Sequence, residues 1–151
     1  MEVWFYHLER RGREEALPVL LEKALARGWR AVVQAKSEEL LDALDQRLWT
    51  YADDSFLAHG RASDGDPDLQ PVYLTTGDEN PNGARLRLFV EDAPILPSLG
   101  AGPYERAMLV FDGRDEAELA GARAQWRAVR DAGLPASYWA QDAAGRWEKK
   151  A

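Results

Sequence analysis

The sequence of 151 residues contains no cysteine. Disulfide bonds, thiolate metal sites and a cysteine nucleophile are therefore excluded, which fits a cytoplasmic protein. The opening MEVWFYHLERR has an acid at position 2 and no long apolar run, so it is unlike a signal peptide. No stretch reaches the roughly 18 apolar residues that a membrane helix needs. We therefore expect a soluble, cytoplasmic protein with no membrane partner.

Histidine and catalytic motifs are also scarce. Only His7 and His59 occur, and a base without a recognisable nucleophile beside it is not a catalytic set. The phosphate loop G-x-x-x-x-G-K-[ST], the dinucleotide motif G-x-G-x-x-G and the nucleophile elbow G-x-S-x-G are absent. The acidic loop 64–68 lacks the glycine and the glutamate that complete a calcium loop, since Leu69 and Thr75 stand there. The sequence predicts no enzyme activity for the isolated chain, no cofactor and no metal ion.

Positive charge is in deficit, with 19 basic against 26 acidic side chains and a net charge of −7. Nucleic-acid binding rests on neutralising phosphates, so this balance argues against a direct nucleic-acid partner. The distribution is uneven, however. Residues 121–151 hold six basic and three acidic side chains, a net charge of +3, which leaves −10 for the remainder. A basic segment on an acidic body indicates attraction of one anionic partner.

Apolar periodicity predicts strands that alternate with helices. Helices are expected at residues 14–27 and 115–131, and a third begins after Ser37, which suits an N-cap. Because Pro18 is unfavourable in a helix interior, the first helix is expected to begin close to Pro18 or to bend there. Strands are expected at residues 2–8, 29–35, 70–75, 85–91, 104–111 and 137–141, followed by a turn at 143–145 and a tail at 146–149.

This alternation predicts one three-layer α/β/α domain over residues 1–151, Rossmann-like, with a mostly parallel central sheet of about five or more strands. Residues 60–69 are expected to form a loop, 77–83 a turn, and 94–103 an irregular segment. No internal repeat, low-complexity tract or linker indicates a second domain.

The stretch from residue 40 to residue 60, LLDALDQRLWTYADDSFLAHG, places large aromatic residues between a helix and an expected strand. Its first half has an apolar helical stripe, which Trp49 follows, and Phe56 opens the next apolar element. Loops at element ends often hold the contacts of α/β domains. Trp49 and Phe56 are thus candidate partner contacts, and the alternative is that they fill the core under the loop.

The last long helix carries a second candidate surface. Arg123, Arg127 and Arg130 lie within about 60° of one another on a helical projection. An apolar stripe that includes Trp126 runs beside them. A basic ridge beside a large indole suits a peptide that is both acidic and apolar, and the alternative is an ordinary amphipathic helix with solvated arginines.

A set of short motifs spans nearly the whole chain in a fixed order. The helix that ends in LDQRLW is followed by SFLAHG, and further motifs are GWR at residues 28–30, QPV at 70–72, NPN at 80–82, YER at 104–106, LVFDG at 109–113 and AGARAQWRAVRDAG at 120–133. Each motif alone is weak, but the ordered set resembles the chi subunit of bacterial DNA polymerase III. Members of that family commonly read SFxPH, whereas this chain has Ala58 in place of the proline.

The resemblance implies a non-catalytic accessory subunit of the polymerase III holoenzyme with an α/β fold and two protein partners. One is the psi subunit of the clamp loader, whose surface in the family corresponds to Trp49 and Phe56. The other is the acidic C-terminal tail of the single-stranded-DNA-binding protein, whose site follows an A-R-x-x-aromatic-basic pattern. That pattern matches residues 122–127, which implies Arg123, Trp126 and Arg127 as tail-binding residues, and the helical spacing adds Arg130 as a candidate.

Two other functions stay open from the residues alone. One is a small nucleotide-binding or hydrolytic α/β enzyme, which the absent catalytic motifs disfavour. The other is a direct single-stranded-DNA binder, which the net negative charge and the lack of a sheet-borne aromatic platform among basic residues disfavour.

Overall fold

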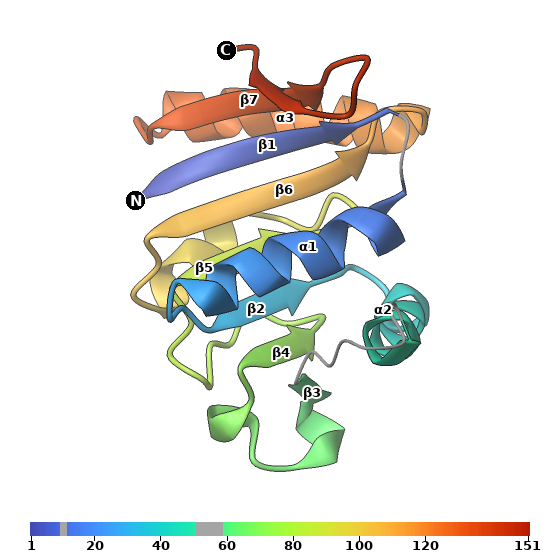
Figure 1. Cartoon of the computed structure of the whole chain (residues 1–151). Helices are drawn as coiled ribbons and strands as arrows, with labels where there is room; N and C mark the ends of the chain where they lie inside the picture. The colour runs from blue at the N-terminus through green and yellow to red at the C-terminus, as the bar shows by residue number, and fades with distance from the viewer. Residues whose placement is uncertain (10–11, 51–58) are drawn as a thin grey trace.

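The computed structural model describes residues 1–9, 12–50 and 59–151. Within these residues, eight strands form one sheet in the spatial order β3-β4-β2-β5-β6-β1-β7-β8, and every neighbouring pair is parallel except β7 with β8 (Figure 1). The strands are β1 (Glu2–Leu8), β2 (Ala31–Gln34), β3 (Gly60–Arg61), β4 (Val72–Thr75), β5 (Leu86–Phe89), β6 (Arg106–Asp112), β7 (Ala136–Gln141) and β8 (Trp147–Lys149).

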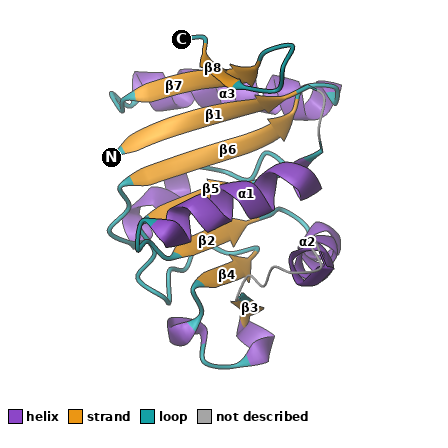
Figure 2. Cartoon of the chain, in the orientation of Figure 1, coloured by secondary structure: helices purple, strands orange, loops and turns teal. Residues whose placement is uncertain are grey.

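Helices cover both faces of this sheet. Two of them, α1 (Arg13–Ala26) and α2 (Glu38–Thr50), pack on one face, and α3 (Glu116–Asp131) packs on the other (Figure 2). Short 3-10 turns lie at η1 (Ala62–Asp64), η2 (Pro67–Leu69) and η3 (Leu96–Ala101). The predicted three-layer α/β fold with a mostly parallel sheet is therefore confirmed.

The core is divided by the sheet, because side chains alternate between its faces along each strand. In β1, Tyr6 and Leu8 join the leucines of α1 and α2, whereas Val3 and Phe5 pack against α3 on the other face. The central strands are buried throughout, as is typical of a parallel sheet covered on both sides. This double cover explains why most side chains of these strands are apolar on both faces.

Helix α1 departs from the sequence prediction at Pro18. The helix begins at Arg13, so Pro18 is its sixth residue and the expected place in the first turn is wrong. Proline has no N–H to donate to the carbonyl four residues earlier, which belongs to Glu14. That carbonyl accepts a hydrogen bond of 3.0 Å from Nε of Arg47 on α2. A neighbouring helix thus supplies the donor that Pro18 lacks.

Of two other local predictions, the cap at Ser37 is confirmed and the loop at 60–69 is wrong in part. Ser37 caps α2 as expected, because its Oγ accepts a hydrogen bond of 3.2 Å from the amide of Leu40. The expected loop at 60–69 is wrong in part, since it begins with β3 and continues through η1 and η2. Residues 60–61 pair with β4, and this pairing satisfies backbone groups that an exposed loop would leave to water. Residues 51–58, including Phe56, lie outside the described residues.

A charged side chain lies inside the layer between the sheet and η3. Arg87 of β5 has no exposed surface. Its guanidinium donates to Oε1 of Gln34, to the hydroxyl of Tyr104 and to the carbonyls of Gly77 and Glu79. All five N–H donors are thereby satisfied, which is the condition for burying a charge. This network ties η3 and the 77–79 turn to the sheet.

Candidate functional site

Helix α3 carries the basic ridge that the sequence predicts. Asp115 caps its amino end, accepting from the amides of Ala117 and Glu118 at 2.9 and 3.2 Å. Ala122 and Val129 are buried against the sheet. The side chains of the ridge are exposed and, within the described part of the chain, form no ion pair: Arg123, Arg127 and Arg130. Their charges are therefore available to an anionic partner.

A cavity of about 260 Å³ opens beside this ridge, between α3 and β7. Trp126 forms one wall, with its ring edge-on to Phe5 at 5.2 Å and to Tyr138 at 5.9 Å between centroids. The remaining lining residues are Arg123, Arg127, Tyr138 and Ala151. Arg130 does not line the cavity, and its guanidinium lies 5.5 Å from the Trp126 ring centroid. The cavity thus combines aromatic walls with two guanidinium groups.

Tyr138 is the lining residue that sequence reasoning missed. It comes from β7 and shares a hydrogen bond of 2.6 Å with Nδ1 of His7 on β1. Burial raises the pKa of the Tyr138 hydroxyl, and the nearby charge of Arg123 opposes that shift. The signal available in the sequence was the period-two alternation of the SYWAQ strand, which places Tyr138 on the face opposite Trp139. His7 has the structural role that its position in the first strand suggests.

The ridge is held in place through Gln125, a residue of the same helical motif. Its amide nitrogen donates to Oδ1 of Asp92 at 2.6 Å and to the carbonyl of Ala93 at 3.1 Å. Its amide oxygen accepts from the backbone of Ile95 at 2.8 Å. Gly121 gives the Asp92 carboxylate room to approach, because a Cβ at this position would collide with it. The glycine and glutamine of the motif therefore fix α3 to the turn after β5.

The second candidate surface lies at the end of α2. Trp49 is 53% exposed, a high value for so large an apolar side chain. Its ring lies 4.8 Å from that of His59, which is buried. Phe56, the other predicted contact, lies outside the described residues. The structure thus places Trp49 and the basic ridge on elements that cover opposite faces of the sheet (Figure 1).

The charges on this side of α2 are largely paired. Arg61 of β3 binds both Glu38 and Asp42, and the hydrogen bond to Asp42 contributes most to raising its pKa. His59 Nε2 lies 2.7 Å from Oδ1 of Asp45. Each surface pair of this kind contributes little to stability, but the pairing leaves few unpaired charges that could bind a partner.

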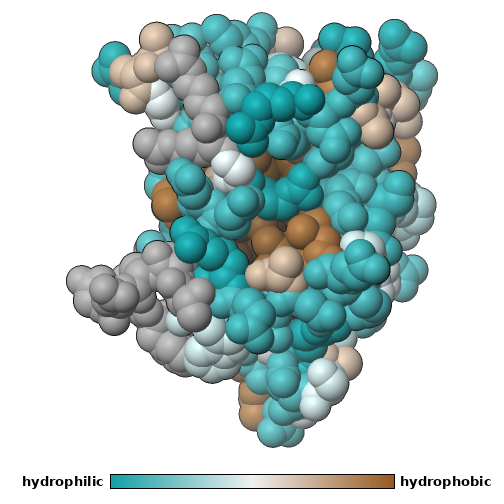
Figure 3. Space-filling view, turned by 90° about the vertical axis from the view of Figure 1, so that its right-hand side faces the viewer, coloured by the Kyte–Doolittle hydropathy of each residue, from teal (hydrophilic) through white to brown (hydrophobic). Residues whose placement is uncertain are grey.

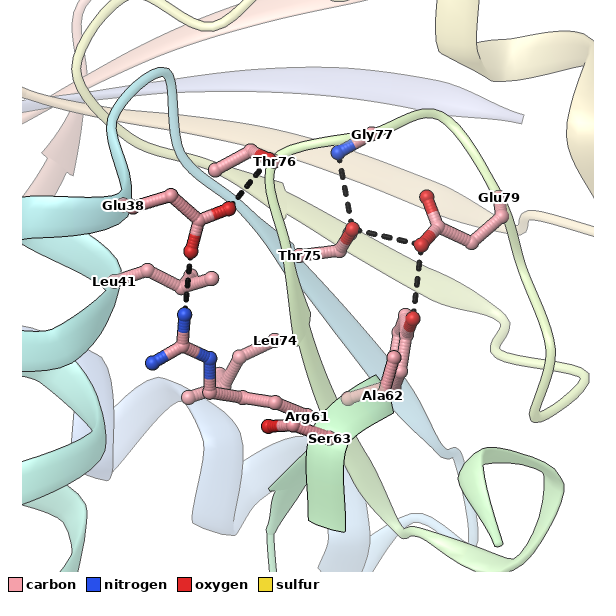
Figure 4. A pocket seen from close by; sticks show the side chains of 11 residues that line it. Glu38, Leu41, Arg61, Ala62, Ser63, Leu74, Thr75, Thr76, Gly77 and Glu79 are labelled. Carbon is pink, nitrogen blue, oxygen red and sulfur yellow. Dashed lines mark hydrogen bonds and ion pairs between the residues drawn. The ribbon is translucent and has the colours of Figure 1, made fainter. Parts of the chain in front are cut away.

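A polar cavity of about 440 Å³ lies between α2 and the carboxyl end of β4 (Figure 4). Its acceptors are already engaged: Glu79 accepts from Tyr73 and from Thr75, both at 2.8 Å, and Glu38 accepts from Thr76 at 3.1 Å. Burial, reinforced by the bond to Glu79, raises the pKa of Tyr73 to about 12. The lining includes no histidine to activate Ser63. These hydrogen bonds describe a structural network around the cavity.

The face at which the parallel strands end is mostly hydrophilic, with a central hollow in which hydrophobic residues are visible (Figure 3). In the ranges that the structure describes, no cluster of three or more acidic or histidine side chains has the arrangement of a metal site. None of the helices described is long and apolar enough to cross a bilayer.

Comparison with known proteins gives two findings. A family model described as the DNA polymerase III chi subunit, HolC, matches residues 1–137. The chain is also 28% identical over 111 residues to a probable DNA polymerase III subunit chi of Rickettsia prowazekii (strain Madrid E), a match that covers 71% of this chain and 67% of the relative. Both findings agree with the ordered motifs and with the α/β fold. The chain belongs to the DNA polymerase III chi subunit family, and its role is that of an accessory subunit in DNA replication.

Proposed function

We propose that this subunit is a non-catalytic bridge between two proteins. Through α3 it binds the acidic, aromatic-ended C-terminal tail of the single-stranded-DNA-binding protein. Through the end of α2 it binds the psi subunit, and thereby the clamp loader. The family supports a polymerase III role, and the two surfaces described above supply one candidate contact for each partner.

The observation that best supports the tail assignment is the cavity between α3 and β7. A tail of this chemistry offers side-chain carboxylates, an apolar ring and a terminal carboxylate. Arg123 and Arg127 face the cavity with guanidinium groups that can bind a carboxylate in bidentate fashion. Trp126 and Tyr138 form aromatic walls, against which a ring packs favourably edge-on or offset. The tail loses conformational entropy on docking, so we expect affinity in the micromolar range.

The loader assignment rests on Trp49. An exposed indole at the end of a helix whose neighbouring charges are paired suits an apolar anchor, and tryptophan is enriched among such anchors. Because α2 and α3 cover opposite faces of the sheet, a partner on one leaves the other accessible.

Reconstitution tests this bridge directly. The chain is mixed with its psi partner and the single-stranded-DNA-binding protein, and the complex is resolved by size-exclusion chromatography. We expect one ternary complex for the unaltered chain. Arg123→Ala should release only the DNA-binding protein, and Trp49→Ala only psi. Lys36→Ala, which removes an exposed cation elsewhere, should release neither. Loss of both partners from either single variant, in a folded protein, would contradict two separate sites.

A further inference from the structure

A second cationic pocket lies where strands β1, β5 and β6 begin, on the face that α1 covers. Its volume is about 190 Å³. Three cations surround it: Lys23 and Arg27 near the end of α1, and Arg106 at the start of β6. Within the described part of the chain none of the three forms an ion pair. This is a concentration of unpaired positive charge on a protein whose net charge is −7.

The cations are held by aromatic rings. The guanidinium of Arg106 lies 3.8 Å from the centroid of Trp4 and 5.6 Å from that of Trp29. Arg27 lies 4.4 Å from the centroid of Trp29. Cation–π contacts of this kind fix the direction of a guanidinium without neutralising it. Two arginines are thereby positioned side by side around one opening.

Arg106 is incompletely satisfied in this arrangement. Its Nε is buried and donates to no acceptor among the described residues. Burial, and next the positive charge of Arg27, lower the pKa of the Arg106 guanidinium. Of the acids that act on Arg106, Glu2 has its carboxylate bound to the hydroxyl of Ser137 at 2.7 Å. An anion in the pocket would relieve the repulsion between the two arginines.

The floor of the pocket is apolar, with buried side chains of Tyr6, Leu20, Ala24, Leu86 and Met108. The ligand therefore joins an oxyanion to a hydrocarbon group. A nucleobase is a poor candidate, because Trp4 has Arg106 near one side and its ring centroid lies 4.9 Å from that of Trp139, in a tilted contact. The ring is thus already engaged and offers no open platform for base stacking.

We propose that this pocket binds an acidic peptide segment in which a carboxylate side chain neighbours an aliphatic one. The carboxylate lies between Arg106 and Arg27, with Lys23 at the rim, and the aliphatic side chain packs on Leu20 and Leu86. The site is separate from the cavity beside α3, since it lies on the opposite face of the sheet. It does not depend on the bridging function proposed above.

The six tryptophans make the test specific, because each indole N–H gives its own NMR signal. The probe is the blocked peptide acetyl-Glu-Asp-Leu-Asp-amide, which has no terminal carboxylate, titrated into the ¹⁵N-labelled full chain. Single Trp→Phe variants assign the signals. We expect saturable shifts of Trp4 and Trp29 that persist when Arg123→Ala weakens the α3 site, with Trp49 unmoved. The matched neutral peptide, with Gln and Asn for Glu and Asp, should leave Trp4 and Trp29 in place.

Charge reversal at the two exposed cations completes the test. The double variant Lys23→Glu, Arg27→Glu should weaken the acidic peptide about tenfold or more, since charge-assisted hydrogen bonds are lost. Lys36→Glu, which reverses an exposed cation that follows β2, at the other end of the strands, should leave the affinity unchanged. The proposal is overturned if the acidic peptide shifts only Trp126, if both peptides bind equally, or if single-stranded oligothymidylate moves Trp4 and Trp29 and the peptide does not.

Discussion

Helices α2 and α3 each carry charged side chains and a large aromatic residue, but they differ in which of these is available to a partner. On α3 the arginines of the ridge are unpaired and the large aromatic, Trp126, is half-buried against Phe5. On α2, Arg61 pairs with Glu38 and Asp42, His59 lies against Asp45, and the large aromatic is left exposed. The surface on α3 thus presents unpaired arginines beside a packed indole. The surface on α2 presents an exposed indole beside paired charges. A partner of α3 should be recognised mainly by charge, and a partner of α2 mainly by apolar contact.

The largest effect is expected at the apolar surface. Truncation of an anchor tryptophan typically costs about 2 kcal/mol or more of binding free energy, which is roughly 30-fold in affinity. Trp49→Ala should therefore weaken psi binding at least that far, as measured by calorimetry, while circular dichroism shows an intact fold. Leu69→Ala removes another exposed apolar side chain, 63% exposed, and serves as the matched control. Unfolding of Trp49→Ala would mean that this residue belongs to the core.

At the surface on α3, we expect the affinity for the tail peptide to fall about tenfold or more. Arg123→Ala removes one guanidinium that lines the cavity, and each charged hydrogen bond is worth roughly 1.5–3 kcal/mol. Calorimetry with a synthetic tail peptide measures the loss, and a peptide without its final aromatic residue should bind about as weakly. Arg130→Ala should cost less, because Arg130 lies over Trp126 outside the cavity. Undiminished binding by both Arg123→Ala and the shortened peptide would place the tail site elsewhere.

The close contact between Gly121 of α3 and Asp92 gives a prediction about stability. Gly121→Ala should lower the free energy of unfolding by about 1–3 kcal/mol, because the added Cβ meets the carboxylate of Asp92. With Asp92→Ala already present, the same change should become neutral or stabilising, since alanine favours a helix over glycine by about 1 kcal/mol. Urea unfolding of the four proteins gives the cycle. Equal effects of Gly121→Ala in both backgrounds would show that the contact is unimportant.

Loss of the hydrogen bond between Arg47 of α2 and the Glu14 carbonyl of α1 should have the smallest effect, a small decrease in the free energy of unfolding. Arg47→Met leaves the Glu14 carbonyl without its donor, at a cost of about 0.5 kcal/mol because the site is exposed to water. Pro18→Ala supplies the missing N–H within α1, so the cost of Arg47→Met should shrink in that background. Thermal unfolding of the single and double variants measures this coupling. Strict additivity would show that Arg47 does not compensate for Pro18.

The comparison also shows what sequence reasoning can reach. The stripe of α3 was predictable, because Arg123, Arg127 and Trp126 lie on one helix whose period fixes their directions. The cap at Ser37 was predictable for the same reason, since the donor is three residues away. Periodicity within an element therefore predicted the three helices, most of the strands and the basic ridge of α3.

What the sequence could not give depends on neighbours brought together by the fold. Tyr138 reaches Trp126 only because β7 pairs with β1. Pro18 was misplaced because its compensating donor, Arg47, lies in another helix. Arg106 meets Trp4 and Trp29 from three separate segments, so no local pattern predicted that pocket.

The salt dependence of the two binding reactions tests the contrast between α2 and α3 most directly. The screening length falls from about 10 Å at 0.1 M salt to about 3 Å at 1 M, so exposed charges lose most of their attraction. Calorimetry from about 0.05 to 0.5 M NaCl should show a steady decline in tail-peptide affinity and a nearly constant affinity for psi. Arg123→Ala should flatten the decline for the tail, whereas Lys36→Ala should leave it unchanged. Equal salt dependence for the two partners would contradict recognition by charge on α3 and by apolar contact on α2.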